Sequence, residues 1–320
     1  MATLDISLTS ANGVKRRPKV VEFLIRMVRE KPLGTLGGII ALVLLFTGTF
    51  ADVLAPYGMN QTSSAIRLLA PSTQHWMGTD DLGRDVLTRV IYGARVSMMV
   101  GLFASAISLS IATLIGVVTG YLGGTLDLIV QRVVDAFISF PMLVFIMVII
   151  SITGAGLLPV IIVIGIQSGI AMSRVIRSAT LSIRENTYVG AAAAIGSSNA
   201  WILWRHIIPN VMPTMLVVFA TRVPQSILLE ASLSFIGFGI PAPAPTWGGM
   251  LSSTGITYMT RAPWMVIFPG AALAIVVYGI NMLADALRDL LDPKLTGGIG
   301  RYGLKREELI KRLRQAGRLV

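Results

Sequence analysis

Few side chains in this sequence have the types and spacing that chemistry needs. The two histidines, His75 and His206, lie on opposite sides of the membrane in the topology derived below, so they cannot share a metal ion. The chain has no cysteine, which excludes disulfides, thiol catalysis and thiolate metal sites. It also has no Gly-x-x-x-x-Gly-Lys-Ser/Thr phosphate loop and no Gly-x-Ser-x-Gly nucleophile turn. The sequence therefore predicts no catalytic residue, no metal site and no cofactor bound by this chain.

Ionisable side chains within apolar runs are the remaining candidates, because charge is costly to bury in lipid. Arg222 lies within such a run and is the first candidate for a solute pathway or gate. Glu230 lies near the end of the same run, where contact with water is the alternative explanation. Asp135 is the third pathway candidate, although snorkelling or mutual pairing within the group Asp127, Arg132 and Asp135 explains it equally well.

Residues 184–210 lie between two long apolar runs, yet they are too polar and too interrupted to span a bilayer. Asn186 or Thr187 can cap a short helix that Gly196 ends, and a second helix can follow as far as Pro209. Apolar and mostly small residues recur on one face of the first helix: Tyr188, Ala191, Ala192 and Ile195. We expect this segment to lie across the membrane surface and to offer a flat face to a partner protein.

The composition is that of a membrane protein. Hydrophobic residues make up 54% of the chain, charged residues only 13%, and the mean hydropathy is +0.74. A water-soluble domain could not bury so much apolar surface, so we expect an all-α polytopic membrane protein. The net charge of +11 is explained by cationic loops facing anionic membrane lipid, and it does not require a nucleic-acid partner.

The sequence has six apolar runs that we interpret as membrane spans, and the first is long enough to cross about 30 Å of hydrocarbon. They lie at about residues 33–51, 96–119, 128–153, 157–172, 211–229 and 265–284. The chain is thus divided into a basic N-terminal segment at 1–32, a transmembrane domain at 33–290 and a basic tail at 291–320. Within the tail, residues 301–320 have the pattern of an amphipathic helix on the membrane surface.

The distribution of positive charge predicts the orientation of these spans. With both termini in the cytoplasm, the cytoplasmic segments hold 21 of the 27 lysines and arginines. The opposite side keeps only Arg67, Arg84, Arg89, Arg95 and Arg261. Both termini and residues 184–210 are therefore expected in the cytoplasm.

Two runs within this segment carry a family resemblance. Residues 188–196 read Tyr-Val-Gly-Ala-Ala-Ala-Ala-Ile-Gly, and residues 205–210 read Arg-His-Ile-Ile-Pro-Asn. They resemble the cytoplasmic EAA loop of ABC-importer permeases, in which Glu-Ala-Ala is followed after three residues by Gly and later by Ile/Leu-Pro. The resemblance assigns ATPase coupling to the matching positions Tyr188, Val189, Gly190, Ala191, Ala192, Ile195, Gly196, Ile208 and Pro209.

Further stretches narrow the resemblance to the dipeptide/oligopeptide/nickel permeases. Those stretches are residues 75–85 (His-Trp-Met-Gly-Thr-Asp-Asp-Leu-Gly-Arg-Asp), 92–95, 120–124, 230–237 and 285–293. The long loop before the second span is similar to that of the C-type subunit. The sequence departs from the pattern at Gly190, where the family has glutamate, and at Ala193, a commonly basic position.

The resemblance implies a type I ABC-importer permease fold in the bacterial inner membrane. It also implies a second homologous permease subunit, two cytoplasmic ATP-binding subunits that hold ATP-Mg, and an extracytoplasmic substrate-binding protein that delivers peptide. The loops at 52–93 and 231–262 would meet the binding protein. On this interpretation Ala192→Asp would place a charge on the docking face and abolish uptake.

Three alternatives remain open. Nickel or another small solute could replace peptide, although no cluster of metal ligands is evident. An ion-driven secondary transporter would show broken helices at mid-membrane and inverted repeats. A membrane scaffold without transport activity is the third alternative.

Overall fold

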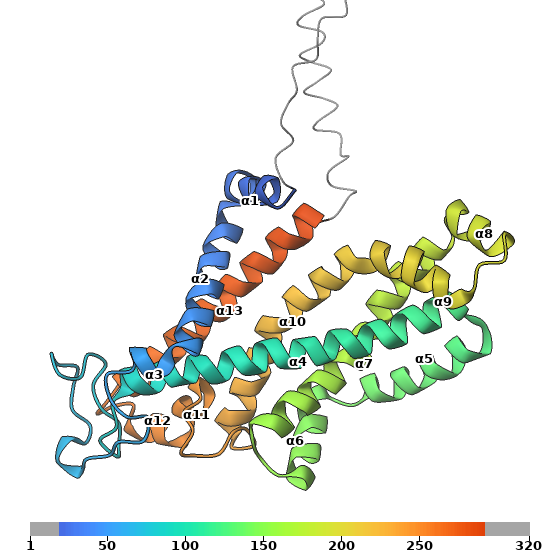
Figure 1. Cartoon of the computed structure of the whole chain (residues 1–320). Helices are drawn as coiled ribbons and strands as arrows, with labels where there is room; N and C mark the ends of the chain where they lie inside the picture. The colour runs from blue at the N-terminus through green and yellow to red at the C-terminus, as the bar shows by residue number, and fades with distance from the viewer. Residues whose placement is uncertain (1–18, 292–320) are drawn as a thin grey trace, which may run out of the picture.

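The computed structural model describes residues 19–291, and their regular structure is helical apart from one isolated antiparallel bridge between Thr79 and Asp85. Figure 1 shows two short helices, α8 and α9, at one end of the molecule and α3, α11 and α12 at the opposite end. The long helices are α2 (Pro32–Thr49), α4 (Val86–Leu122), α7 (Leu157–Arg184), α10 (Ile208–Ile236) and α13 (Trp264–Leu291). The shorter ones are α1 (Lys19–Glu30), α3 (Ala51–Leu54), η1 (Ser64–Ile66), α5 (Gly124–Ser139), α6 (Met142–Thr153), α8 (Thr187–Ala194), α9 (Asn199–Ile202), the π-helix η2 (Leu203–Ile207), α11 (Trp247–Leu251) and α12 (Ser253–Tyr258).

The long helices confirm the polytopic prediction. Five helices within the described residues are long and apolar enough to cross a membrane, and a sixth span exists if α5 and α6 are counted as one. The helices α4 and α7 extend well beyond the apolar runs predicted at 96–119 and 157–172. Their more polar ends continue as helix outside those runs. The predicted amphipathic helix at 301–320 lies outside the described residues.

The third predicted span, 128–153, is wrong as a single helix. It is broken into α5 and α6, whose axes differ by 88°. Pro141 stands at the break and Phe140 before it is extended, with φ −80° and ψ 136°. A residue before proline is pushed out of the helical region by a steric clash with the proline ring, which accounts for the break.

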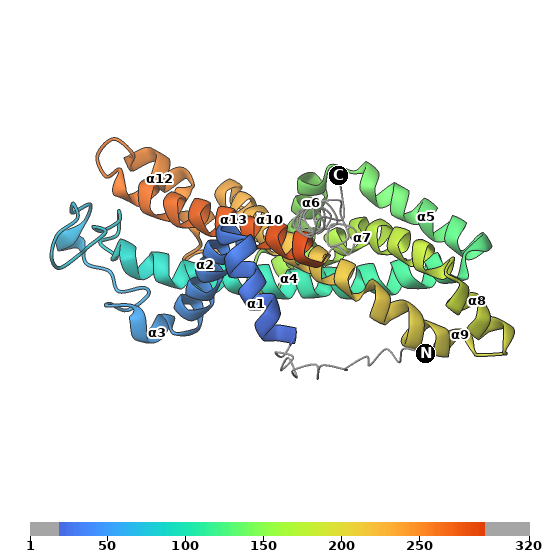
Figure 2. The same cartoon turned by 90° about the horizontal axis from the view of Figure 1, so that it is seen from above.

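The α4–α7 pair forms the centre of the fold (Figure 2). Its closest approach runs along glycines: a Cβ at Gly116 would lie 2.6 Å from the Ser173 carbonyl oxygen, and one at Gly169 would lie 2.8 Å from that of Ser108. Without a hydrophobic driving force in lipid, helices associate through such close backbone packing. Small residues therefore serve close helix packing at these positions.

Helices α2 and α13 form a second close pair, which packs against α4 and α10. Gly37 faces the backbone of Gly279, and a Cβ at Gly37 would overlap the Gly279 carbonyl oxygen. Its neighbour Gly38 has open space, with the nearest side-chain atom, on Leu283, at 3.7 Å. Glycine is therefore required for close packing at Gly37 and is not required at Gly38.

Candidate functional site

The segment predicted to dock a partner forms a short helix, α8, at one end of the molecule (Figure 1). Asn186 is the residue before its first turn, but its side chain does not cap α8. Its Nδ2 donates instead to the Ile183 carbonyl oxygen in the last turn of α7 at 2.9 Å. Ser198 caps the following helix α9, since its Oγ accepts from the Trp201 amide at 3.3 Å. The predicted short helix before Gly196 and the start of a second helix after it are confirmed, whereas the predicted cap at the first helix is wrong. The predicted end of the second helix at Pro209 is also wrong, because α9, η2 and α10 follow one another without a break through this residue.

The exposed face of α8 differs from the predicted one. Val189 and Ala192 are only 3% and 5% exposed and pack in a cluster with Ile176 and Ile207. Ala192 was predicted on the free face, but it points into the chain's own core. Val189 and Ala192 therefore anchor α8 to α7 and η2.

The surface of α8 open to a partner is small and apolar. Its members are Tyr188, Gly190, Ala191, Ala193, Ala194 and Ile195, followed by Gly196. Ile195 is 82% exposed, and Gly196 has φ +84°, which lets the chain turn sharply after the helix. A Cβ added at Gly190 would meet nothing within 4 Å, so this position projects outward from the molecule.

Aromatic contacts hold α8 against the segment that follows it. The His206 ring lies 5.7 Å from the Tyr188 ring and 5.0 Å from the Trp201 ring, in an edge-on contact with the latter. Ile208 starts α10 as a partly buried residue, and Pro209 is exposed in its first turn. The segment 184–210 is thus packed against the end of α7 and the start of α10.

Asp135 lies in a set of ion pairs between α5 and α7. It pairs with Arg174, and Arg132 lies 3.8 Å away. One end of the same interface has Asp127 bound by Arg177 through two contacts of 2.6 and 2.5 Å. The alternative of pairing, now with α7 as the source of the main partners, therefore explains these charges.

Arg222 and Glu230 share one stripe of α10 with two serines at intervals of four residues, Ser226 and Ser234. Glu230 is fully buried, and its Oε1 accepts from the Ser234 hydroxyl at 2.7 Å. Within residues 19–291, the Oε2 of Glu230 and the Nε of Arg222 are buried and have no hydrogen-bond partner. Ser226 faces Ser105 of α4 at 3.5 Å, which places part of this stripe in the α4–α10 seam.

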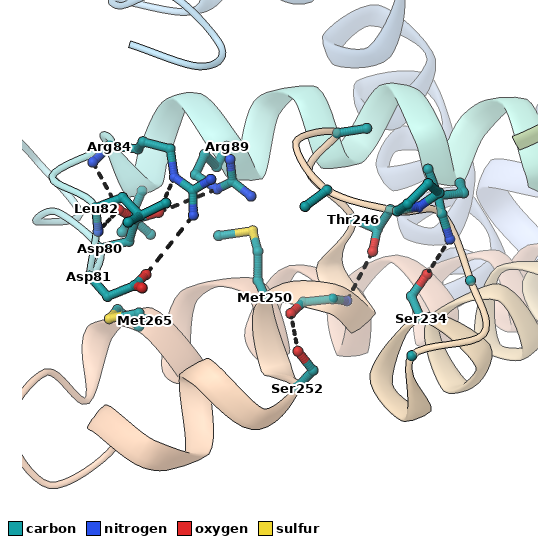
Figure 3. Close-up of a pocket in the computed structure, with 18 residues that line it drawn as sticks. Asp80, Asp81, Leu82, Arg84, Arg89, Ser234, Thr246, Met250, Ser252 and Met265 are labelled. Carbon is teal, nitrogen blue, oxygen red and sulfur yellow. Dashed lines mark hydrogen bonds and ion pairs between the residues drawn. The ribbon is translucent and has the colours of Figure 1, made fainter. Parts of the chain in front are cut away.

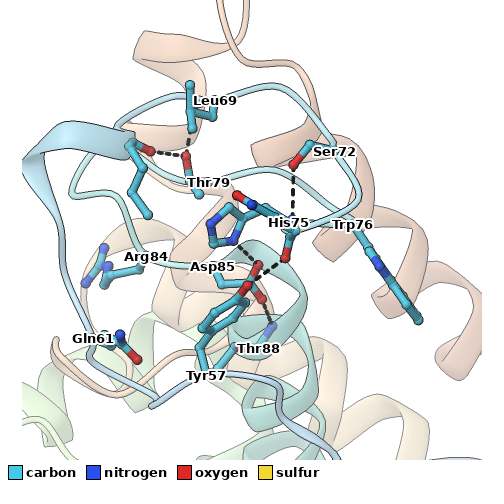
Figure 4. A network of polar contacts seen from close by, with 12 residues as sticks. Tyr57, Gln61, Leu69, Ser72, His75, Trp76, Thr79, Arg84, Asp85 and Thr88 are labelled. Carbon is cyan, nitrogen blue, oxygen red and sulfur yellow. Dashed lines mark hydrogen bonds and ion pairs between the residues drawn. The ribbon is translucent and has the colours of Figure 1, made fainter.

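A second polar centre lies at the opposite end of the molecule, where the chain from 55 to 85 folds against the start of α4 (Figure 4). The Nδ1 of His75 lies 2.9 Å from Oδ1 of Asp85, and both side chains are buried. The other oxygen of Asp85 accepts from the Thr88 amide at 2.7 Å and so caps α4. The Tyr57 ring packs at 4.9 Å from the His75 ring.

Asp80 is the centre of the adjoining turn. Its Oδ1 accepts from the Leu82 and Arg84 amides at 2.9 Å each, and its Oδ2 accepts from Arg84 Nε at 2.6 Å. The indole of Trp264 donates to the Thr79 carbonyl oxygen at 3.0 Å and ties this turn to the start of α13. Residues 75–85 carried the family resemblance, but the hydrogen bonds within this turn could not be read from the sequence.

The described part of the chain is therefore a helical, multi-pass structure with a small apolar helix, α8, at one end and an ordered polar loop region at the other. The sequence profile of the family described as "Binding-protein-dependent transport system inner membrane component" matches residues 112–297. The chain belongs to this family and is a multi-pass protein of the inner membrane.

Relatives match over most of their length. The chain is 38% identical over 270 residues to the dipeptide transport system permease protein DppC of Alkalihalophilus pseudofirmus, covering 84% of this chain and 88% of the relative. It is 36% identical to the oligopeptide transport system permease protein OppC of Bacillus subtilis, over 83% and 87% of the two chains. It is also 36% identical to the glutathione transport system permease protein GsiD of Pectobacterium atrosepticum, over 86% and 91%.

Among solved structures, the chain is similar to one from the MetNI methionine ABC transporter in inward-facing conformations. The TM-score is 0.48 at 19% identity, and the match covers 65% of this chain and 96% of the other.

Proposed function

We propose that this chain is a permease subunit of an ATP-driven, binding-protein-dependent importer of di- and oligopeptides. The observation that carries the proposal is α8: a short apolar helix whose outer face is free and whose inner face is locked to α7 and η2. The names of the relatives, which are permeases for dipeptide, oligopeptide and glutathione, support a peptide substrate.

The proposed complex contains a second homologous permease, two cytoplasmic ATP-binding subunits and an extracytoplasmic binding protein. The ATP-binding subunits hold ATP-Mg, and each would receive the coupling helix of one permease in a surface cleft. In this chain Tyr188, Gly190, Ala191, Ile195 and Gly196 form the contact, since they are exposed. Val189 and Ala192 hold the helix, and Ile208 and Pro209 join it to α10.

Alternating access would follow from this connection. Closure of the ATP-binding subunits moves α8, and α7 and α10 move with it because the segment between them is packed. Arg222, Glu230 and Asp135 remain the proposed polar residues of the pathway. Arg222 has the strongest case, because Asp135 is paired with Arg174 and Glu230 is buried between helices.

The coupling role is tested by placing a charge on the free face of α8. Ala191→Asp changes an exposed residue, so the variant should insert and fold normally while uptake falls at least tenfold. The matched control is Ala200→Asp, an exposed alanine in α9 outside the proposed contact. Wild-type uptake by the Ala191→Asp variant would contradict the proposal. Ala192→Asp cannot serve as this test, because it buries an unpaired charge and disturbs the fold itself.

Purification of the tagged chain from its native membrane tests the whole assembly. We expect a second permease and ATP-binding subunits to co-purify, with ATP hydrolysis stimulated by the peptide-loaded binding protein. The break between α5 and α6 is a feature that an ion-driven carrier could use. Isolation of the chain alone, with uptake that stops when the proton or sodium gradient is removed, would therefore favour that alternative.

A further inference from the structure

A pocket of about 390 Å³ lies among the loop structure at the start of α4, the end of α10 and the helix α11. Figure 3 shows its charged side chains gathered at one end, with Thr246 and Ser234 at the other. Small-molecule sites in proteins have volumes of roughly 300–1,000 Å³, so this pocket is sized for a small ligand or for one end of a longer one.

The charged side chains that line the pocket differ in how many hydrogen bonds and ion pairs they make. Asp80 has both oxygens occupied by three close donors from Leu82 and Arg84. Arg84 also faces Asp81 at 4.0 Å, so this arginine serves both carboxylates. Arg89 has a weaker contact with the same carboxylate, because its Nε lies 3.7 Å from Asp80 Oδ2.

Arg89 is consequently a buried cation with spare hydrogen-bonding capacity. Its side chain lines the pocket and the residue is only 7% exposed. Within the described part of the chain its Nη1 has no hydrogen-bond partner. A buried guanidinium with an unused N–H is the arrangement that favours binding of an anionic oxygen, since such a contact is charge-assisted.

The other residues that line the pocket restrict which kind of anionic ligand it can bind. Apolar side chains from four parts of the chain line it: Val86, Ile240, Pro241, Met250 and Met265. A free inorganic anion would gain nothing from these surfaces. A carboxylate attached to an apolar side chain would use both the arginine and the apolar wall.

We propose that this pocket binds the C-terminal residue of the transported peptide, with Arg89 donating to its terminal carboxylate. The proposal rests on the peptide-import function above and adds to it a substrate contact inside this permease chain. The pocket lies at the end of the molecule opposite α8 and next to the α10 polar stripe, because Ser234 belongs to both. A peptide released at this end would thus be held by its carboxylate before it passes between the helices.

The test measures direct binding of a radiolabelled dipeptide, alanyl-leucine, to the purified permease–ATPase complex without the binding protein. Three ligands are compared: the free acid, its C-terminal amide and its N-acetyl derivative. We expect the free acid and the N-acetyl form to bind, and the amide to bind about 10- to 100-fold more weakly, since a hydrogen bond to a charged group is lost.

Arg89→Gln should weaken binding of the free acid by a similar factor and remove the difference between acid and amide. The control is Arg95→Gln on the same helix, since Arg95 pairs with Asp52 outside the pocket. A second variant, Met265→Trp, fills the apolar part of the pocket and leaves Arg89 in place, so it should weaken acid and amide alike. This variant keeps the test valid if Arg89→Gln fails to fold.

Equal binding of acid and amide by the wild-type complex would overturn the proposal, as would a preference for the acid that survives Arg89→Gln. Absence of any dipeptide binding would overturn it too. The proposal would also be overturned if Arg89→Gln changed only the affinity of the complex for the peptide-free binding protein, because Arg89 would then contact that protein and not the peptide. Failure of ATP-driven uptake in the wild-type complex, with Arg89-dependent binding intact, would instead refute the import function and leave the site standing.

Discussion

Asp85 connects two structures with one carboxylate. One oxygen caps α4 through the Thr88 amide, and the other contacts the buried ring of His75. Removing the carboxylate leaves the helix end uncapped and the His75 ring without its partner.

We therefore predict that Asp85→Ala lowers the stability of the chain by about 2–4 kcal/mol, which combines the loss of a helix cap with that of a buried hydrogen bond. In a protein of this size the midpoint of thermal unfolding in detergent should fall by about 5–15 °C.

The control for this variant is Asp52→Ala. Arg95 donates to Asp52 at 2.7 Å and holds the pKa of this carboxyl below its ordinary value. The pair therefore persists at neutral pH and is lost as the pH falls through that lowered pKa. Because the Asp52 carboxylate is exposed, the substitution should change the unfolding midpoint little. Equal shifts for the two variants would contradict the role assigned to Asp85.

At this scale the sequence located the important stretches but not the roles of their residues. The motif positions 188–196 do form a helix, yet periodicity alone could not tell which face Val189 and Ala192 occupy. Both faces of α8 are apolar and small, so only the position of η2 and α7 decides which face is covered. The spare capacity of Arg89 likewise depends on the other contacts of Asp80, which come from two backbone amides and the Arg84 side chain.

Among the helices, the α2–α13 contact gives the sharpest comparison between neighbouring residues. Gly37→Ala would push a methyl group into the backbone of Gly279, so the two helices must separate. We expect a loss of about 1–3 kcal/mol, the usual cost of overpacking a close contact.

Gly38→Ala should be neutral or slightly stabilising, because its Cβ meets only ordinary contacts and alanine is the better helix former. Thermal unfolding of the two variants in the same detergent measures the difference. A similar loss in both would mean that the crossing point lies elsewhere.

The bend between α5 and α6 can be measured directly, because the chain has no cysteine to interfere with labelling. Spin labels at exposed Leu126 and Ile152 should lie about 28 Å apart across the bend, against about 40 Å for a continuous helix. Labels at Leu158 and Arg184 in α7 have the same sequence separation without a bend and should show the longer distance. Equal distances for the two pairs would refute the bend.

The bend also marks a limit of hydropathy as a predictor. An apolar run of sufficient length predicts a span, and residues 128–153 satisfy that criterion. Pro141 was visible in the run, but a proline inside a helix can produce a kink or a complete break. Helix α10 contains Pro213 and Pro224 and remains a single helix, so the proline itself does not decide the outcome.

For the whole molecule, the helical multi-pass fold class followed from composition, while its orientation in the membrane rests on the charge distribution alone. Residue 76 lies in the loop structure at one end and residue 195 lies after α8 at the other, and both side chains are well exposed. A membrane-impermeant maleimide should label Trp76→Cys in intact spheroplasts and Ile195→Cys only after permeabilisation. The reverse pattern would place both termini outside the cytoplasm.

The fold class was predictable because apolar content and charge distribution are properties of the whole sequence. The packing of the loop structure at 55–85 against Trp264 was not, because it joins residues about 185 positions apart through one indole hydrogen bond. Such contacts leave no local periodicity. They appear only when the helices that carry them are placed in space.

Helix α4 has 37 residues and is therefore about 55 Å long, while the hydrocarbon layer is about 30 Å thick. One end carries the Asp85 cap, and near the other end the Tyr121 hydroxyl donates to Asn199 within the segment 184–210. The helix is thus longer than the hydrocarbon layer is thick, so its two ends extend beyond the layer on opposite sides of the membrane. A tilt of 10° about its middle would carry each end about 5 Å in opposite directions. On the proposed function, one rotation of α4 would then link a displacement driven by ATP at the α8 end to a change in shape of the proposed peptide pocket at the other end.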